Sequence, residues 1–140
     1  MSLIMGILVD AQDSFEFSKH YSSGGTKLWQ FYNYMDAFID WLNTNCPART
    51  FCFTMDNLNI HKSPIILDLI AESGHRVVFR APYWSCDGPI QYVFNTIHTK
   101  LQLDYDGVDN VEDLIAKIDD IIFVLVHSSF CAYFVHVGFP

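Results

Sequence analysis

The chain has 140 residues, of which 51% are hydrophobic and 16% aromatic, and its formal net charge is −8. This size and apolar content predict one packed domain, or part of one, and exclude a disordered chain. The acidic balance argues against tight binding of DNA by the chain alone, because like charges repel over a Debye length.

The sequence does not support a membrane-spanning or secreted protein. The longest apolar run, residues 121–126, is too short to span a bilayer and is typical of a buried helix. Residues 1–9 lack a basic leader and a small-residue cleavage site, so we interpret them as containing a strand rather than a signal peptide. The four cysteines form no C-x-x-C pair, which favours a reducing intracellular setting over a disulfide framework or a zinc site.

The first part of the chain predicts one strand and one helix. The apolar run at residues 3–9 predicts a buried strand, and residues 10–27, with a Ser-Ser-Gly-Gly stretch, predict a turn-rich connection. Apolar residues then recur at helical spacing over 28–42, which indicates an amphipathic helix. Thr26 is the expected N-cap of this helix, and Pro47 is expected to stop it.

The middle of the chain predicts a strand, a helix and a second strand. Residues 50–55 are rich in aromatics and threonine and predict a strand that ends at Asp56. The Ser-Pro pair at 63–64 marks a helix start, Gly74 marks its end, and residues 76–79 predict the next strand. Four apolar side chains of this helix are expected in the core, namely Ile65, Ile66, Leu69 and Ile70.

Two further helices are predicted after a loop. The first opens at Asp-Gly-Pro, residues 87–89, and the second begins at Asn110 with Asp113 in a capping-box-like arrangement. Strands that alternate with helices predict parallel pairing and an α/β layer, in which chemistry gathers at the carboxyl ends of strands. Asp56 occupies such an end and is therefore the first candidate functional residue.

Two motifs at matched spacing carry a family resemblance. One is Met-Asp-Asn at 55–57 with Ile-His-Lys-Ser at 60–63; the other is Ala-Pro-Tyr at 81–83 with Gly-Pro-Ile-Gln at 88–91 and Val-Phe at 93–94. The two acid positions that these motifs define, 56 and 91, have 34 residues between them. These segments resemble the second-acid and third-acid motifs of the mariner-type (Tc/mariner) transposases, which belong to the DDE superfamily of endonucleases.

The resemblance implies that residues 1–140 are a partial catalytic domain with a ribonuclease-H-like fold. That fold is a three-layer α/β arrangement around a mixed sheet, here with its early strands missing. In this family three carboxylates hold two Mg²⁺ ions for DNA cleavage and strand transfer, which occur in the nucleus. The resemblance makes Asp56 a catalytic residue and metal ligand, assigns the third-acid position to Gln91, and makes Asn57, His61 and Lys62 binding residues near the metal or the DNA backbone.

Two departures from the family pattern predict that the chain is catalytically inactive. Gln91 stands where the family has Glu, and its neutral oxygen loses a charge interaction of about 4 kcal/mol at ~4 Å and an effective dielectric near 20. The strand at 3–9 is interpreted as the third strand of the fold, so the first acid and its strand are expected to be absent. Asp10 and Asp13 lie too near Asp56 in sequence to replace that acid. Asp87, one helical turn before Gln91, is an alternative but weaker candidate ligand.

Other interpretations of the same residues remain open. Asp56 can simply cap a turn, Asn57 can be a turn former, and His61 with Lys62 can be a polar helix start. The alternative to a transposase-derived domain is a non-enzymatic module for protein interaction or weak nucleic-acid binding, which can self-associate through an exposed strand edge. A phosphotransferase with Asp56 as nucleophile would need a second Asp two residues later, where Leu58 stands.

Overall fold

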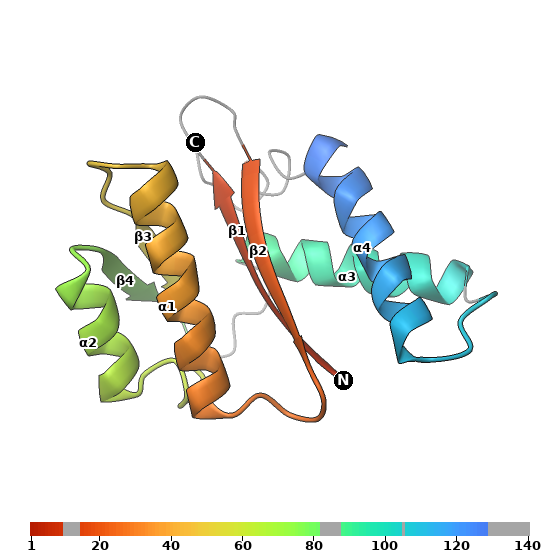
Figure 1. Cartoon of the computed structure of the whole chain (residues 1–140), viewed down its shortest axis with the longest axis horizontal. Coiled ribbons are helices and arrows are strands. Elements are labelled where there is room, and N and C mark those ends of the chain that lie inside the picture. Colours follow the sequence, from red (N-terminus) through yellow and green to blue (C-terminus); the bar gives the residue numbers. More distant parts are fainter. Residues whose placement is uncertain (10–14, 82–87, 105, 129–140) are drawn as a thin grey trace. The chain divides into compact units, whose positions relative to one another are not determined.

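The computed structural model describes residues 1–9, 15–81, 88–104 and 106–128 (Figure 1). Its elements are of mixed α/β class, as the sequence predicted. None of the described helices combines the length and the apolar character that a membrane crossing requires. The elements in chain order are β1 (Ser2–Val9), β2 (Phe15–Ser22), α1 (Leu28–Asn45), β3 (Cys52–Met55), α2 (Pro64–Glu72), β4 (Arg76–Phe79), α3 (Pro89–Leu103) and α4 (Val111–Ser128).

The chain divides into two compact units. The first unit comprises Met1–Gly6 and Ser18–Trp84, and the second comprises Ile7–Phe17 and Ser85–Pro140. The first unit therefore contains α1, β3, α2 and β4, and the second contains α3 and α4.

Residues 15–22 form a strand, so the sequence prediction of a turn-rich connection over 10–27 was wrong there. This strand, β2, pairs with β1 in a two-stranded sheet. Only residues 10–14 separate the two strands, and such a short connection requires antiparallel pairing. No strand was predicted between residues 3–9 and the helix, and 3–9 was interpreted as the third strand of the family fold; this order is corrected, because a further strand, β2, follows β1 before α1.

β1 comes very close to α1 at Gly6. A Cβ added to Gly6 would lie 2.8 Å from Cε1 of Phe38 and 2.9 Å from the hydroxyl oxygen of Tyr34. Both aromatic side chains belong to the buried face of α1, which consists of Phe31, Tyr34, Met35, Phe38, Ile39 and Leu42. Glycine is needed at position 6 because no side chain fits between β1 and these rings.

β3 and β4 form a separate, parallel two-stranded sheet joined by α2. Cys52 is opposite Arg76 and Met55 is opposite Phe79, and the crossover helix ends before Gly74, whose φ is 81°. One face of this sheet is half-buried and the other is exposed. The half-buried side chains are Phe53, Met55, Val77 and Phe79, and the exposed ones are Cys52, Thr54, Arg76 and Val78.

The covered face of the β3–β4 sheet packs against α1 and α2. The rings of Phe38 and Phe53 lie 5.9 Å apart in an edge-to-face arrangement, which joins α1 to β3. From α2, Ile66 and Ile70 are fully buried, as the sequence predicted. The same prediction was wrong for Ile65, whose side chain is 50% exposed.

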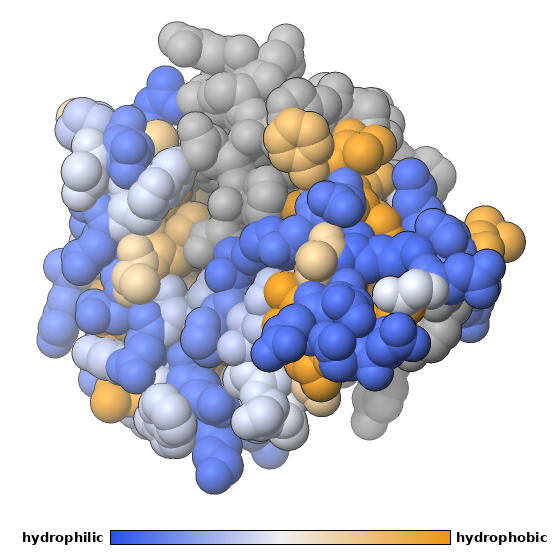
Figure 2. Space-filling model, turned by 45° about the vertical axis from the view of Figure 1, so that its right-hand side comes forward, coloured by the Kyte–Doolittle hydropathy of each residue, from blue (hydrophilic) through white to orange (hydrophobic). Residues whose placement is uncertain are grey.

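The second unit is built on contact between α3 and α4. Asn110 Oδ1 accepts the backbone N–H of Asp113 at 2.9 Å, which confirms the predicted start of α4. The exposed apolar side chains of the two helices include Leu103, Phe123 and Val124. Figure 2 shows one face of the molecule, on which hydrophobic side chains lie in separate patches among hydrophilic ones. The buried residues of these helices include Val93, Ile97, Ile118, Ile121, Ile122 and Leu125.

His75 is a buried histidine that joins three segments of the first unit. Its Nδ1 accepts the backbone N–H of Phe51 at 3.3 Å, and its Nε2 lies 3.1 Å from Asn43 Oδ1. This pair of partners selects the neutral ring with its hydrogen on Nε2. Burial lowers the pKa of His75 below the ordinary histidine value of 6.5, because a charged ring loses its hydration.

Substitution of Gly6 by alanine is expected to lower the free energy of unfolding by about 1–3 kcal/mol, the usual cost of overpacking. The added methyl group would overlap the Phe38 ring. The matched control is Gly25→Ala, because a Cβ at Gly25 meets nothing within 4 Å. Urea unfolding followed by circular dichroism measures both, and equal stabilities of the two variants would contradict the close approach of β1 to α1.

The lowered pKa of His75 predicts that stability falls in mild acid. The unfolded chain takes up a proton near pH 6.5 and the folded chain does so only at lower pH. The His75 contribution is therefore complete above about pH 6.5 and is lost as the pH falls toward the folded-state pKa. Urea unfolding between pH 7.5 and 5 should show a smaller pH dependence for His75→Gln than for the native chain. His98→Gln, a change at an exposed histidine of α3, should keep the native pH dependence.

Candidate functional site at the carboxyl ends of β3 and β4

Polar side chains follow both strands of the parallel sheet in the first unit. Asp56 and Asn57 come directly after β3, and Arg80 comes directly after β4. The Arg80 N–H donates to the carbonyl oxygen of Met55 at 2.9 Å, so the strand pairing continues to this edge. The carboxyl edge of a parallel sheet is where ligand sites commonly form in α/β proteins.

Asn57 connects the two strand ends. Its side-chain amide donates a hydrogen bond to the backbone carbonyl of Arg80. Within the described residues Asn57 makes no hydrogen bond to Asp56. Asn57 therefore holds the loop after β3 against the end of β4, a role that neither sequence interpretation of this residue included.

The side chains of Asp56 and His61 are in close polar contact. The Nδ1 of His61 lies 2.7 Å from Oδ1 of Asp56 and 3.3 Å from the Asp56 carbonyl oxygen. Turn hydrogen bonds bring the histidine back to the carboxylate: His61 N–H donates to the Leu58 carbonyl at 3.0 Å, and Lys62 N–H donates to the Asn59 carbonyl at 3.2 Å. The local turn, rather than a helix start, therefore positions His61.

The contact between Asp56 and His61 is supported from α1 and is partly open to solvent. The rings of Phe31 and His61 have centroids 4.7 Å apart, so a buried aromatic side chain lies against the imidazole. The His61 side chain is 17% exposed and the Asp56 side chain 39% exposed. Because solvent reaches the carboxylate, we assign the pair no more than about 1 kcal/mol of stability.

The pair can orient an imidazole, but it lacks a nucleophile. A carboxylate on Nδ1 fixes the ring and leaves Nε2 as the nitrogen that can exchange protons. In the described part of the chain, however, no serine, threonine or cysteine side chain is hydrogen-bonded to His61. The geometry therefore does not match the nucleophile–base pairs of covalent catalysis.

The described residues also do not form a two-metal site. Mg²⁺ binds oxygen ligands, and two-metal chemistry needs several carboxylates in one place. At the described carboxyl ends of β3 and β4, Asp56 is the one carboxylate, and its Oδ1 is already engaged by His61. Nowhere in the residues that the structure describes do three His, Cys, Asp or Glu side chains gather as ligands. A cation also stands at this edge, since Arg80 follows β4.

Several of the residues that the sequence selected lie together in the first unit. Asp56, Asn57 and His61 share the carboxyl edge of the first unit, and Lys62 is exposed in the adjacent turn. Gln91 lies in the first turn of α3, in the second unit, where its N–H donates to the Gly88 carbonyl at 2.9 Å. The remaining candidates, Asp10, Asp13 and Asp87, fall outside the described residues.

Arg80 and the partnership of His61 with Asp56 were missed by the sequence analysis. Arg80 has an evident signal, because it is the residue that follows the second predicted strand, as Asp56 follows the first. One terminal nitrogen of its guanidinium, Nη1, is buried and has no hydrogen-bond partner among the described residues. The contact between His61 and Asp56 is harder to predict from the sequence, because it depends on a turn conformation that the residue types at 57–62 do not specify.

Comparisons of the chain with protein-family models, curated proteins and solved structures found no match. The likeness to mariner-type transposases therefore rests on the two sequence motifs.

Proposed function

We propose that this chain descends from the catalytic domain of a mariner-type transposase and no longer cleaves DNA. The observation that carries the proposal is the position of Asp56, whose partly exposed carboxylate follows a parallel strand, β3, that α2 connects to β4. The resemblance requires its second acid at the end of such a strand. The sequence order of elements, two strands before α1 and then β3, α2, β4 and α3, supports a ribonuclease-H-like ancestry that has lost one early strand. The single mixed sheet of that fold is not seen, because the described strands form two separate two-stranded sheets.

The loss of activity follows from the charges that remain. The ancestral reaction needs three carboxylates around two divalent cations. This chain keeps Asp56, has the neutral Gln91 at the third-acid position, and places a histidine on the Asp56 carboxylate. We infer that the carboxylate which once served a metal ion now holds the loop after β3 through His61, with Mg²⁺ no longer required.

Purified chain is expected to leave supercoiled plasmid DNA intact in the presence of Mg²⁺ or Mn²⁺. The physical reason is the shortage of carboxylates, which leaves the attacking and leaving oxygens without metal stabilisation. The measurement is the conversion of supercoiled to nicked plasmid, resolved on an agarose gel over a time course.

Two variants make this assay decisive. Asp56→Ala removes the proposed ancestral ligand, and Asp68→Ala removes an exposed carboxylate of α2 as a matched change in charge. The proposal expects the native chain and both variants to be equally inactive. Robust nicking by the native chain that persists in Asp68→Ala and disappears in Asp56→Ala would overturn it.

A second candidate function is protein interaction through the β3–β4 sheet. The sheet has two strands, so each strand leaves one edge without a described partner, and the face formed by Cys52, Thr54, Arg76 and Val78 is exposed. Unpaired edges of this kind promote pairing with another chain. We propose a second copy of this chain as the partner, because identical edges can pair around a twofold axis.

Self-association is expected to depend on concentration and to weaken when a charge is placed on this sheet. Light scattering during size-exclusion chromatography, in reducing buffer, should show dimer for the native chain and a shift toward monomer for Val78→Lys. Val111→Lys is the matched control, because Val111 of α4 is exposed to a similar degree, 58% against 54% for Val78. Monomer at every concentration, or an equal shift in both variants, would exclude the sheet as the interface.

A further inference from the structure

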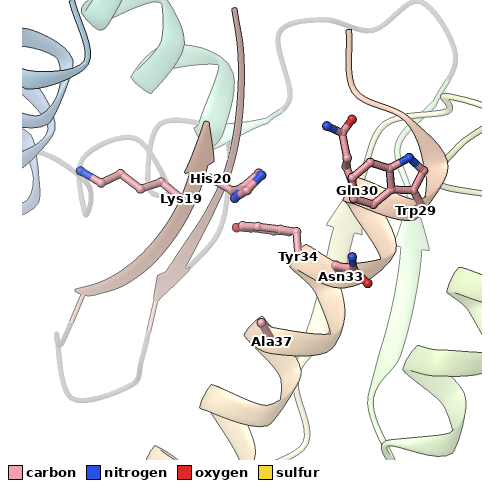
Figure 3. Close-up of a pocket in the computed structure, with 7 residues that line it drawn as sticks. All are labelled: Lys19, His20, Trp29, Gln30, Asn33, Tyr34 and Ala37. Atoms are coloured by element: carbon pink, nitrogen blue, oxygen red, sulfur yellow. The ribbon is translucent and has the colours of Figure 1, made fainter. Parts of the chain in front are cut away.

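A cavity of about 300 Å³ lies between β2 and the first half of α1, within the first unit (Figure 3). His20 of β2 and Tyr34 of α1 point toward one another across it, whereas the Lys19 side chain extends away from α1. Trp29, Gln30, Asn33 and Ala37 continue the lining along one side of α1. The volume is at the lower end of the range of about 300–1,000 Å³ that is usual for small-molecule sites.

The lining combines an aromatic surface with hydrogen-bonding groups. Trp29 is 60% exposed, so most of the indole surface is open to a ligand. The Gln30 Oε1 accepts the backbone N–H of Lys27 at 2.8 Å, which fixes this side chain and leaves its amide hydrogens as donors. Lys27, rather than the predicted Thr26, is thus the N-cap of α1. Asn33 adds a second side-chain amide, which can both donate and accept.

The cavity is also electrostatically suited to an anion. Among the residues that the structure describes, no carboxylate lines it, although the chain has 16 acidic residues against 8 lysines and arginines. The first turn of α1, to which Trp29 and Gln30 belong, contains no acidic residue, so the positive end of the helix dipole is not neutralised there. His20 adds a ring nitrogen that can donate to an anion.

We propose that this cavity binds a nucleoside 5′-phosphate, with its base stacked on Trp29 and its phosphate beside His20. A planar base matches the indole surface, and the two amides match the hydrogen-bonding edge of the base. The phosphate matches the described part of the lining, which includes His20 and no carboxylate. The same chemical group is offered by a free mononucleotide and by one nucleotide of a single strand. The proposal uses no residue of the β3–β4 edge, so it is independent of the ancestry of Asp56.

Isothermal titration calorimetry of the full chain tests the proposal with four probes: adenosine 5′-monophosphate, adenosine, inorganic phosphate and a deoxyadenylate decamer. The monophosphate is expected to bind at one saturable site, more tightly than adenosine and far more tightly than phosphate. Trp29→Ala should weaken this binding by about tenfold or more, as stacking on an aromatic ring requires. Trp29→Phe should retain most of the affinity.

The phosphate contact has its own matched pair of variants. His20→Ala should weaken binding of the monophosphate and leave adenosine unchanged, while His98→Ala, at an exposed histidine of α3, should change neither. Circular dichroism confirms that each variant is folded.

The two sources of the ligand give different results. Tighter binding of the decamer than of the monophosphate identifies a single strand, and binding of the monophosphate alone identifies a free nucleotide. Absence of saturable binding for all four probes, or unchanged affinity in both Trp29→Ala and His20→Ala, would overturn the proposal.

Discussion

The first unit depends on the aromatic face of α1, and above all on Phe38. This one ring lies against the backbone of β1 at Gly6 and against the ring of Phe53 in β3. In the part of the chain that the structure describes, the two sheets share no backbone ladder, and side-chain packing on α1 connects β1 with β3. The stabilisation that such packing gives depends on how well the side chains of the two elements fit together, because it is the sum of many short van der Waals contacts.

The same helix also supports the polar edge of the sheet. Phe31, two turns before Phe38 on α1, contacts His61, which in turn holds Asp56. A candidate site is thereby fixed on one side by an apolar contact and on the other by the bond from Asn57 to the end of β4. Such an arrangement stabilises the conformation of the loop after β3 through protein contacts alone.

Local sequence signals predicted most of the helices and strands, but they did not predict the contacts between them. The strand at 76–79, the helix start at Pro64 and the α4 cap at Asn110 followed from propensity and from known terminal residues. β2 was missed because its lysine, histidine and serines, next to a Gly pair, resemble a loop more than a strand.

The candidate site was predicted in part for the same reason. Asp56 was recognised because a strand end is visible in the sequence, and Arg80 offered the same signal. The contact of Asp56 with His61 depends on the turn between them, and the contact of His61 with Phe31 joins segments far apart in the chain. Neither can be read from periodicity, since periodicity reports which face of an element is apolar and not which residue meets it.

The described strands of the two sheets are not joined by a hydrogen-bond ladder, and this has a mechanical consequence for the first unit. Within a sheet, displacement of a strand by one residue breaks its ladder and reverses its faces. Between β1 and β3 no such penalty exists in the described chain, and sliding along α1 is opposed only by the shapes of side chains. Gly6 is the position at which β1 can contact the Phe38 ring, because a side chain there would overlap the ring. The position of this glycine in the strand therefore determines where β1 packs along α1.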